Sequence, residues 1–147
     1  MKTIHCLIIA ISFCYSMMSA QTTIITTSQL TKHEWLFIEK PSENLYEGYR
    51  FDDKNIYTFV DYDGRAEVSA PYYLSGTPDT VFDKSKVGKN KSGKYIIVDW
   101  ETRLTVDSPW EHITVIYQVL DASDNSLLLA HPKKLSQQLR LTPYFKN

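Results

Sequence analysis

Short runs of alternating apolar and polar residues recur along the chain after Thr31, separated by turn residues. Residues 65–70 place alanine and valine on one side and charged or hydroxyl side chains on the other, and residues 112–120 alternate in the same way. A period of two is that of a β-strand with one dry and one wet face. No segment keeps a period of 3.6 over three turns. The pattern therefore predicts an all-β protein.

The predicted strands follow one another closely enough to form an antiparallel meander. An Asp63-Gly64 pair between two runs is typical of a hairpin, and residues 121–125 are similarly rich in turn formers. Sequential strands joined by short turns need no crossover helices, and about eight of them can close into a barrel that leaves no exposed edge. The expected fold is such a barrel, with strands at residues 34–39, 45–51, 54–61, 65–74, 94–101, 103–107, 112–120 and 125–131.

The C-terminal tail has two interpretations. A short helix can begin at Pro132, with Leu135 and Leu139 on one face. Alternatively, Leu139 and Leu141 alternate in a final strand.

The N-terminus has the order of a secretory signal peptide over residues 1–20: a basic start, a brief apolar run and a small residue, Ala20, at the expected cut. The apolar run is shorter than the ~20 residues of a membrane span, so no transmembrane helix is expected in the mature chain. We expect export to the periplasm or beyond in a Gram-negative bacterium. Residues 21–29 are predicted to be disordered, and residues 30–147 to form the single barrel domain.

Cleavage at this point also removes Cys6 and Cys14, so the mature chain has no cysteine and no possible disulfide. Small secreted animal domains usually depend on disulfides, which favours a bacterial source. Phe13 precedes Cys14 where a lipoprotein requires a small residue, so lipidation is not expected.

The net charge of the mature chain argues against some classes of partner but identifies none. The mature chain has 15 basic and 17 acidic side chains, which favours neither nucleic acid nor an anionic membrane as a partner. Its many tyrosine, tryptophan, valine and isoleucine residues suit a half-buried sheet.

Several of these features together resemble the small bacterial lipocalin-like (calycin-type) secreted proteins. They are the signal peptide, the early Trp35, the meander, the block YYLS at residues 72–75, and FDKSKVGK and GKYIIV at residues 82–89 and 93–98. Lipocalins usually carry glycine where His33 stands, so the similarity is to the broader class of barrel. The resemblance covers most of residues 30–131 and implies a cup for a small, mostly apolar molecule; it carries over no catalytic residue.

Residues 88–94, GKNKSGK, fit most of the phosphate-binding pattern G-x-x-x-x-G-K-[ST]. Tyr95 stands where the magnesium-binding hydroxyl is required, and a β-forming run follows where the pattern needs a helix. We therefore predict a basic loop that leads into a strand, without nucleotide. The five lysines of residues 84–94 then form a solvated face or, at the open end of the barrel, guide an acidic ligand to the mouth.

No metal or cofactor is predicted. Aligned on Gly64, a calcium loop would lack two of its oxygen ligands, so Asp61 and Asp63 are interpreted as part of a hairpin turn. His33, His112 and His131 are too widely spaced to form a recognised ligand pair.

The aromatic positions give the candidate ligand site. Residues expected to line a barrel cavity are Phe37, Tyr57, Phe59, Val68, Tyr72, Trp100, Val115 and Tyr117. The alternative is that such side chains only fill the core, as an eight-stranded barrel permits. Trp35 is expected to plug the closed end.

The expected function is that of an exported lipocalin-like protein that binds a small apolar or amphipathic molecule, with no catalysis. One alternative is a protein-binding barrel, an inhibitor or envelope-complex subunit, that uses residues 78–93 and 143–145. The other is an envelope hydrolase, which would require a facing carboxylate pair or a histidine–acid pair in a cleft.

Overall fold

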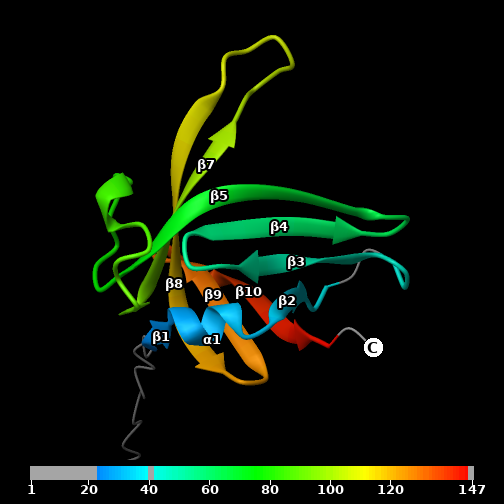
Figure 1. Ribbon diagram of the computed structural model, residues 1–147, viewed down its shortest axis with the longest axis horizontal. Helices are drawn as coiled ribbons and strands as arrows, with labels where there is room; N and C mark the ends of the chain where they lie inside the picture. Colours follow the sequence, from blue (N-terminus) through cyan, green and yellow to red (C-terminus); the bar gives the residue numbers. More distant parts are fainter. Residues whose placement is uncertain (1–22, 40–41, 146–147) are drawn as a thin grey trace, which may run out of the picture.

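The computed structural model describes residues 23–39 and 42–145. Eight strands close into an antiparallel barrel in the order β10-β2-β3-β4-β5-β7-β8-β9, and β1 and β6 form a separate two-stranded sheet (Figure 1). This confirms the all-β meander and its closure. The elements are β1 Ile25–Thr26, α1 Thr27–Thr31, β2 Glu34–Phe37, β3 Tyr46–Phe51, β4 Asn55–Asp61, β5 Arg65–Ser75, the 3-10 turn η1 Lys84–Lys86, β6 Ser92–Gly93, β7 Tyr95–Thr102, β8 Glu111–Ser123, β9 Ser126–His131 and β10 Lys134–Tyr144.

The C-terminal tail supplies the strand that closes the barrel. β10 pairs with β9 on one side and with β2 on the other, which places Leu141 opposite both Leu127 and Phe37. Leu141 is fully buried, so the tail is a strand and the helix interpretation is wrong. The strand expected at residues 103–107 is also wrong. These residues turn between β7 and β8, where the Arg103 guanidinium donates to the Val106 carbonyl oxygen at 2.9 Å.

The N-terminal segment belongs to the barrel domain. The expected signal peptide lies outside the described residues, but the disorder expected at residues 21–29 is wrong from residue 23 onward. Ile25 is buried and pairs with Gly93, and Leu30 of α1 is fully buried. The helix starts at a capping box in which the Gln29 backbone N–H donates to Thr26 Oγ1 at 3.2 Å and the Thr26 N–H donates to Gln29 Oε1 at 2.9 Å.

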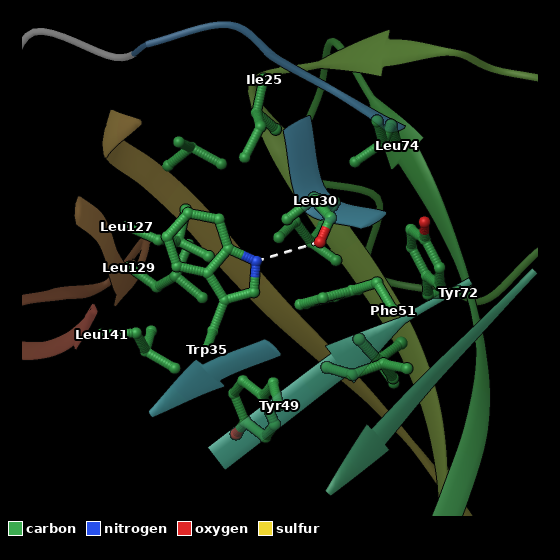
Figure 2. Close-up of a cluster of buried hydrophobic side chains, with 14 of the residues drawn as sticks. Ile25, Leu30, Trp35, Tyr49, Phe51, Tyr72, Leu74, Leu127, Leu129 and Leu141 are labelled. Carbon is green, nitrogen blue, oxygen red and sulfur yellow. Dashed lines mark hydrogen bonds between the residues drawn. The ribbon is translucent and has the colours of Figure 1, made fainter. Parts of the chain in front are cut away.

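The end of the barrel next to α1 is closed and filled. The indole N–H of Trp35 donates to the Leu30 carbonyl oxygen at 3.0 Å, so the tryptophan fixes the helix over the core (Figure 2). Around them lie buried side chains from most of the strands, among them Phe51, Leu74, Leu127, Leu129 and Leu141. Trp35 is 2% exposed and fills this end, where the sequence predicts a plug.

The opposite end of the barrel is open because β5 and β7 diverge. β5 pairs with β4 along residues 65–71, but with β7 only along residues 72–75. Residues 99–102 of β7 pair with β8 alone. In Figure 1 the β4–β5 hairpin extends to one side and the β7–β8 hairpin rises away from it. We call this end of the barrel, where both hairpins turn, the open end.

Candidate functional site

Apolar side chains from six strands remain accessible at the open end. Phe37, Trp100, Val115, Tyr117 and Leu139 pack on the buried core but keep part of their surface exposed. Val60, Val68 and Ile113 lie farther out, on the inward side of β4, β5 and β8, and are 37%, 67% and 44% exposed. Their direction follows from the alternation of their strands, since the core residues Ile56 and Ala70 share it and Ile113 lies opposite Trp100. We call these eight residues the mouth.

The hydroxyl of Tyr117, a mouth residue, meets that of Tyr49 inside the barrel. The hydroxyl oxygens of Tyr49 and Tyr117 lie 3.0 Å apart, and the side chain of Trp100 also hydrogen-bonds to Tyr117. An indole nitrogen can only donate, so the Tyr117 oxygen accepts from Trp100. The two hydroxyls carry two protons, and the bond between them uses one. Whichever tyrosine donates, one proton remains for an acceptor in the mouth.

Both tyrosines are neutral at ordinary pH. Burial raises the pKa of Tyr49 far above its usual range, and the neighbouring Tyr117 raises it further. Burial likewise raises the pKa of Tyr117. The pair therefore provides an uncharged hydrogen-bond donor among apolar side chains.

Five of the eight predicted lining residues belong to the mouth: Phe37, Val68, Trp100, Val115 and Tyr117. Tyr72 also faces inward, but it lies near the closed end, where its hydroxyl donates to the Asp52 carbonyl oxygen at 2.8 Å and its ring contacts Phe51. Thr27 of the N-terminal helix hydrogen-bonds to the same hydroxyl. Tyr72 therefore joins helix and barrel and does not line the mouth.

Tyr57 and Phe59 lie on the outer face of the barrel, so their assignment to a cavity is wrong. Ile56 of β4 points into the core, so Tyr57 and Phe59, which have the opposite parity in the strand, point outward. The Arg50 guanidinium covers the Tyr57 ring at 3.7 Å and the Arg65 guanidinium covers the Phe59 ring at 4.1 Å. Because these arginines cover aromatic rings outside the barrel, the aromatic character of Tyr57 and Phe59 does not indicate whether they point inward or outward.

Ion pairs hold that outer face together. Arg65 donates to both carboxylate oxygens of Glu34, at 2.9 and 3.1 Å, and to Glu67 at 2.9 Å. Arg50 also donates to Glu67, at 2.9 Å. The network joins β2, β3 and β5 across the wall and is structural.

The sequence-based set missed Tyr49, Val60, Ile113 and Leu139. Ile113 stands on the dry face of the run at residues 112–120, so the alternation contained a signal for it. Leu139 lies in the tail whose structure the sequence left open. Tyr49 depends on a contact between distant strands, and nothing local marks it.

The lysine-rich loop lies away from the mouth. Phe82 and Val87 pack on the outer face of the barrel against Tyr73, Ile97 and Ile116. The backbone of Lys91 accepts a hydrogen bond from Thr27 in the N-terminal helix, next to the closed end. Residues 88–94 include the short strand β6 and lead into β7, as expected for a basic loop before a strand. The idea that these lysines guide a ligand to the mouth is wrong.

A histidine–acid pair lies on the outer wall. His112 Nδ1 is 3.1 Å from Asp99 Oδ2, and its Nε2 is 3.6 Å from Glu101 Oε1. Thr114 lies two residues further along the same strand face, which is a separation of roughly 7 Å from His112. Its hydroxyl oxygen accepts from the Phe82 backbone N–H at 3.2 Å, so it is not positioned as a nucleophile for the histidine. The pair lines a cavity of about 300 Å³ together with Val81, Phe82, Lys84 and Thr114.

The turn at Asp63 and Gly64, metal-binding clusters and membrane-spanning helices remain to be compared with the structure. Asp63 and Gly64 lie in the tight turn between β4 and β5, where Gly64 has a φ of 110°. Among residues 23–39 and 42–145, no cluster of three histidine, cysteine or acidic side chains is arranged to hold a metal ion. Within the same residues, no helix has the length and apolar character needed to cross a membrane.

Comparison with protein-family models, with curated proteins and with solved structures gives no match to this chain.

Proposed function

We propose that this protein is a binding barrel without chemistry of its own, which takes a small amphipathic molecule at its mouth. The apolar body of the molecule packs on the mouth, and a hydrogen-bond acceptor on it meets the hydroxyl pair of Tyr49 and Tyr117. The observation that carries the proposal is the remaining hydroxyl proton of this pair, which lies beneath accessible apolar side chains.

The apolar surface supplies most of the binding energy in this proposal. Val68 and Ile113 are exposed to water in the free protein, and covering them gains about 25 cal/mol for each Å² removed from water. The core below is filled by Trp35, Leu127 and Leu129. The molecule therefore rests on the open end of the barrel and is not enclosed in a deep cup.

The charge around the mouth favours a neutral ligand. Glu47 stands directly opposite Val60 in the β3–β4 ladder and so shares its inward side. A carboxylate at this place repels an anionic headgroup, and the hydroxyl pair is itself uncharged. A ketone, ester or amide oxygen attached to an apolar body fits both features.

The test uses prodan, a neutral naphthalene dye with a ketone oxygen, and its anionic relative anilinonaphthalene sulfonate. We expect prodan to bind with a shift of its emission, and the sulfonate to bind more weakly. Replacing both Tyr49 and Tyr117 by phenylalanine removes the donor and weakens prodan binding by roughly tenfold, the size of one hydrogen bond.

The matched control is Tyr49→Phe alone, which leaves the Tyr117 hydroxyl and its proton in place and so retains binding. Failure of both dyes to bind the wild-type protein contradicts the proposed function. Equal prodan binding by the wild type and the double variant contradicts the role of the hydroxyl pair. Mass spectrometry of small molecules extracted from the natively purified protein then identifies the physiological ligand.

A further inference from the structure

Two strand edges at the open end have no neighbouring strand among the described residues. Along residues 65–71, β5 pairs with β4 on one side, and no described strand pairs with the other side. Along residues 99–102, β7 pairs with β8 on one side, and its other side pairs with none of the described strands. The two free edges face one another across the opening where β5 and β7 diverge (Figure 1). A free edge presents a row of backbone donors and acceptors to whatever approaches it.

The side chains beside these edges alternate between two environments. On the inward side stand Val68 and Trp100, which are apolar and accessible. On the outward side stand Glu67, held by two arginines, and Glu101, whose side chain is 62% exposed. A strand lying in the opening would meet an apolar surface with every second residue and carboxylates with the others.

We propose that an extended segment of a partner protein adds to this barrel as a strand at the opening between β5 and β7. Strand addition suits a polypeptide, since only a polypeptide supplies backbone N–H and C=O groups at the spacing of a strand edge. This surface goes beyond the small-molecule site, because recognition here depends on backbone pairing and not on the tyrosine hydroxyls.

The alternation also defines the chemistry of the segment. Residues that point inward are apolar, of the size of valine or leucine, and cover Val68 and Trp100. Residues that point outward are polar or basic, because the exposed carboxylate of Glu101, whose Oε1 lies 3.6 Å from His112 Nε2, is on that side. The seven residues of β5 from Arg65 to Pro71 set the longest pairing that this edge allows.

The experiment uses a short fluorescent peptide of alternating valine and threonine with lysines at both ends. Its binding is followed by anisotropy, and amide hydrogen exchange reports which strands it protects. We expect binding that slows exchange within residues 65–71 and 99–102. Two further peptides with the same side chains test the role of backbone pairing. One is N-methylated at alternate positions, which removes the backbone donors on one edge, and the other is methylated at the remaining positions, which removes those on the other edge. At least one of them loses binding by roughly tenfold or more.

The variant Val68→Lys places a charge on the inward side of the free edge and weakens peptide binding by roughly tenfold. Val81→Lys is its matched control, because Val81 is 78% exposed on the loop over the outer wall and its replacement leaves binding unchanged. Both positions are exposed, so neither variant is expected to impair folding.

Several results overturn the proposal: no binding of the alternating peptide, full binding of both methylated peptides, or protection confined to other strands. If the protein self-associates without peptide and the same amides are protected from exchange, the occupant of the opening is a second copy of this chain and not a different partner protein. We expect the variant with phenylalanine at both Tyr49 and Tyr117 to bind the peptide as the wild type does. Failure of peptide binding is therefore distinguishable from failure of dye binding.

Discussion

The hydroxyl oxygens of Tyr49 and Tyr117 lie 3.0 Å apart inside the barrel, although 68 residues separate the two in the chain. The contact joins β3 to β8 across the interior beneath the mouth. Tyr117 hydrogen-bonds to both Tyr49 and Trp100, whereas the hydrogen bond of the Tyr49 hydroxyl is the one to Tyr117. Removing the two hydroxyls should therefore lower the free energy of unfolding by different amounts.

We predict that Tyr117→Phe destabilises the barrel more than Tyr49→Phe. Removing the Tyr117 hydroxyl leaves the Trp100 N–H and the Tyr49 hydroxyl without their hydrogen-bond partner, which costs about 1–3 kcal/mol of unfolding free energy. Tyr49→Phe breaks one neutral hydrogen bond and costs about 1 kcal/mol. Urea unfolding measures both. Equal losses would show that the Trp100 bond contributes nothing.

A second prediction concerns the closed end. Trp35→Phe removes the N–H donated to the Leu30 carbonyl and leaves space in a filled core, so we expect a loss of about 2–4 kcal/mol. Trp110→Phe is the matched control, because Trp110 is 59% exposed and its replacement costs less than about 1 kcal/mol. Thermal and urea unfolding report both losses. A Trp35→Phe variant as stable as the control would mean that the tryptophan does not fix α1.

The sequence predicts the barrel well because strand formation is largely local. Alternation and turn residues mark β3, β4, β5 and β8 without reference to the rest of the chain. Local patterns fail where a distant partner decides. Residues 103–107 and the tail both contain alternating apolar residues, but only the tail finds neighbours, in β2 and β9.

The candidate site is less predictable for the same reason. Alternation indicates that two faces exist, but nothing local states which face of residues 54–61 meets the core. Phe59 is 1% exposed yet lies outside, because an arginine supplied by the next strand covers it. The N-terminal segment appears polar in sequence, and its order depends on burial of Ile25 and Leu30 at the closed end.

A third prediction concerns the close approach of β2 to β3. A Cβ atom added at Gly48 would stand 2.9 Å from the Trp35 carbonyl carbon and nearer still to its oxygen, and backbone atoms cannot move aside as a flexible side chain can. Gly48→Ala therefore costs about 3 kcal/mol or more, or prevents folding. Gly76→Ala is the matched control, since nothing lies within 4 Å of its added Cβ. Circular dichroism and urea unfolding of both variants provide the measurement. If Gly48→Ala is as stable as the control, β2 and β3 are farther apart than described.

A fourth prediction concerns acid stability and Asp79. Hydrogen bonds from Lys86, Thr77 and Tyr73 lower the pKa of this carboxyl from 3.8 to about 2. A pKa that is lower in the folded state stabilises the fold above the unfolded pKa, and this contribution disappears as the pH falls from about 4 to about 2. The Lys86 side chain is 40% exposed, so the contribution is about 1 kcal/mol and not the full value of the shift.

Asp79→Asn measures this contribution. We expect the variant to be less stable than the wild type near neutral pH by about 1 kcal/mol, with the difference closing between about pH 4 and pH 2 as the wild-type carboxyl takes up its proton. Asp124→Asn is the matched control, because its side chain is 72% exposed in the turn between β8 and β9 and its replacement changes stability little at any pH. Urea unfolding at a series of pH values gives both differences. A constant difference for Asp79→Asn would mean that the loop over the outer wall is held by the shape of Asp79 and not by its charge.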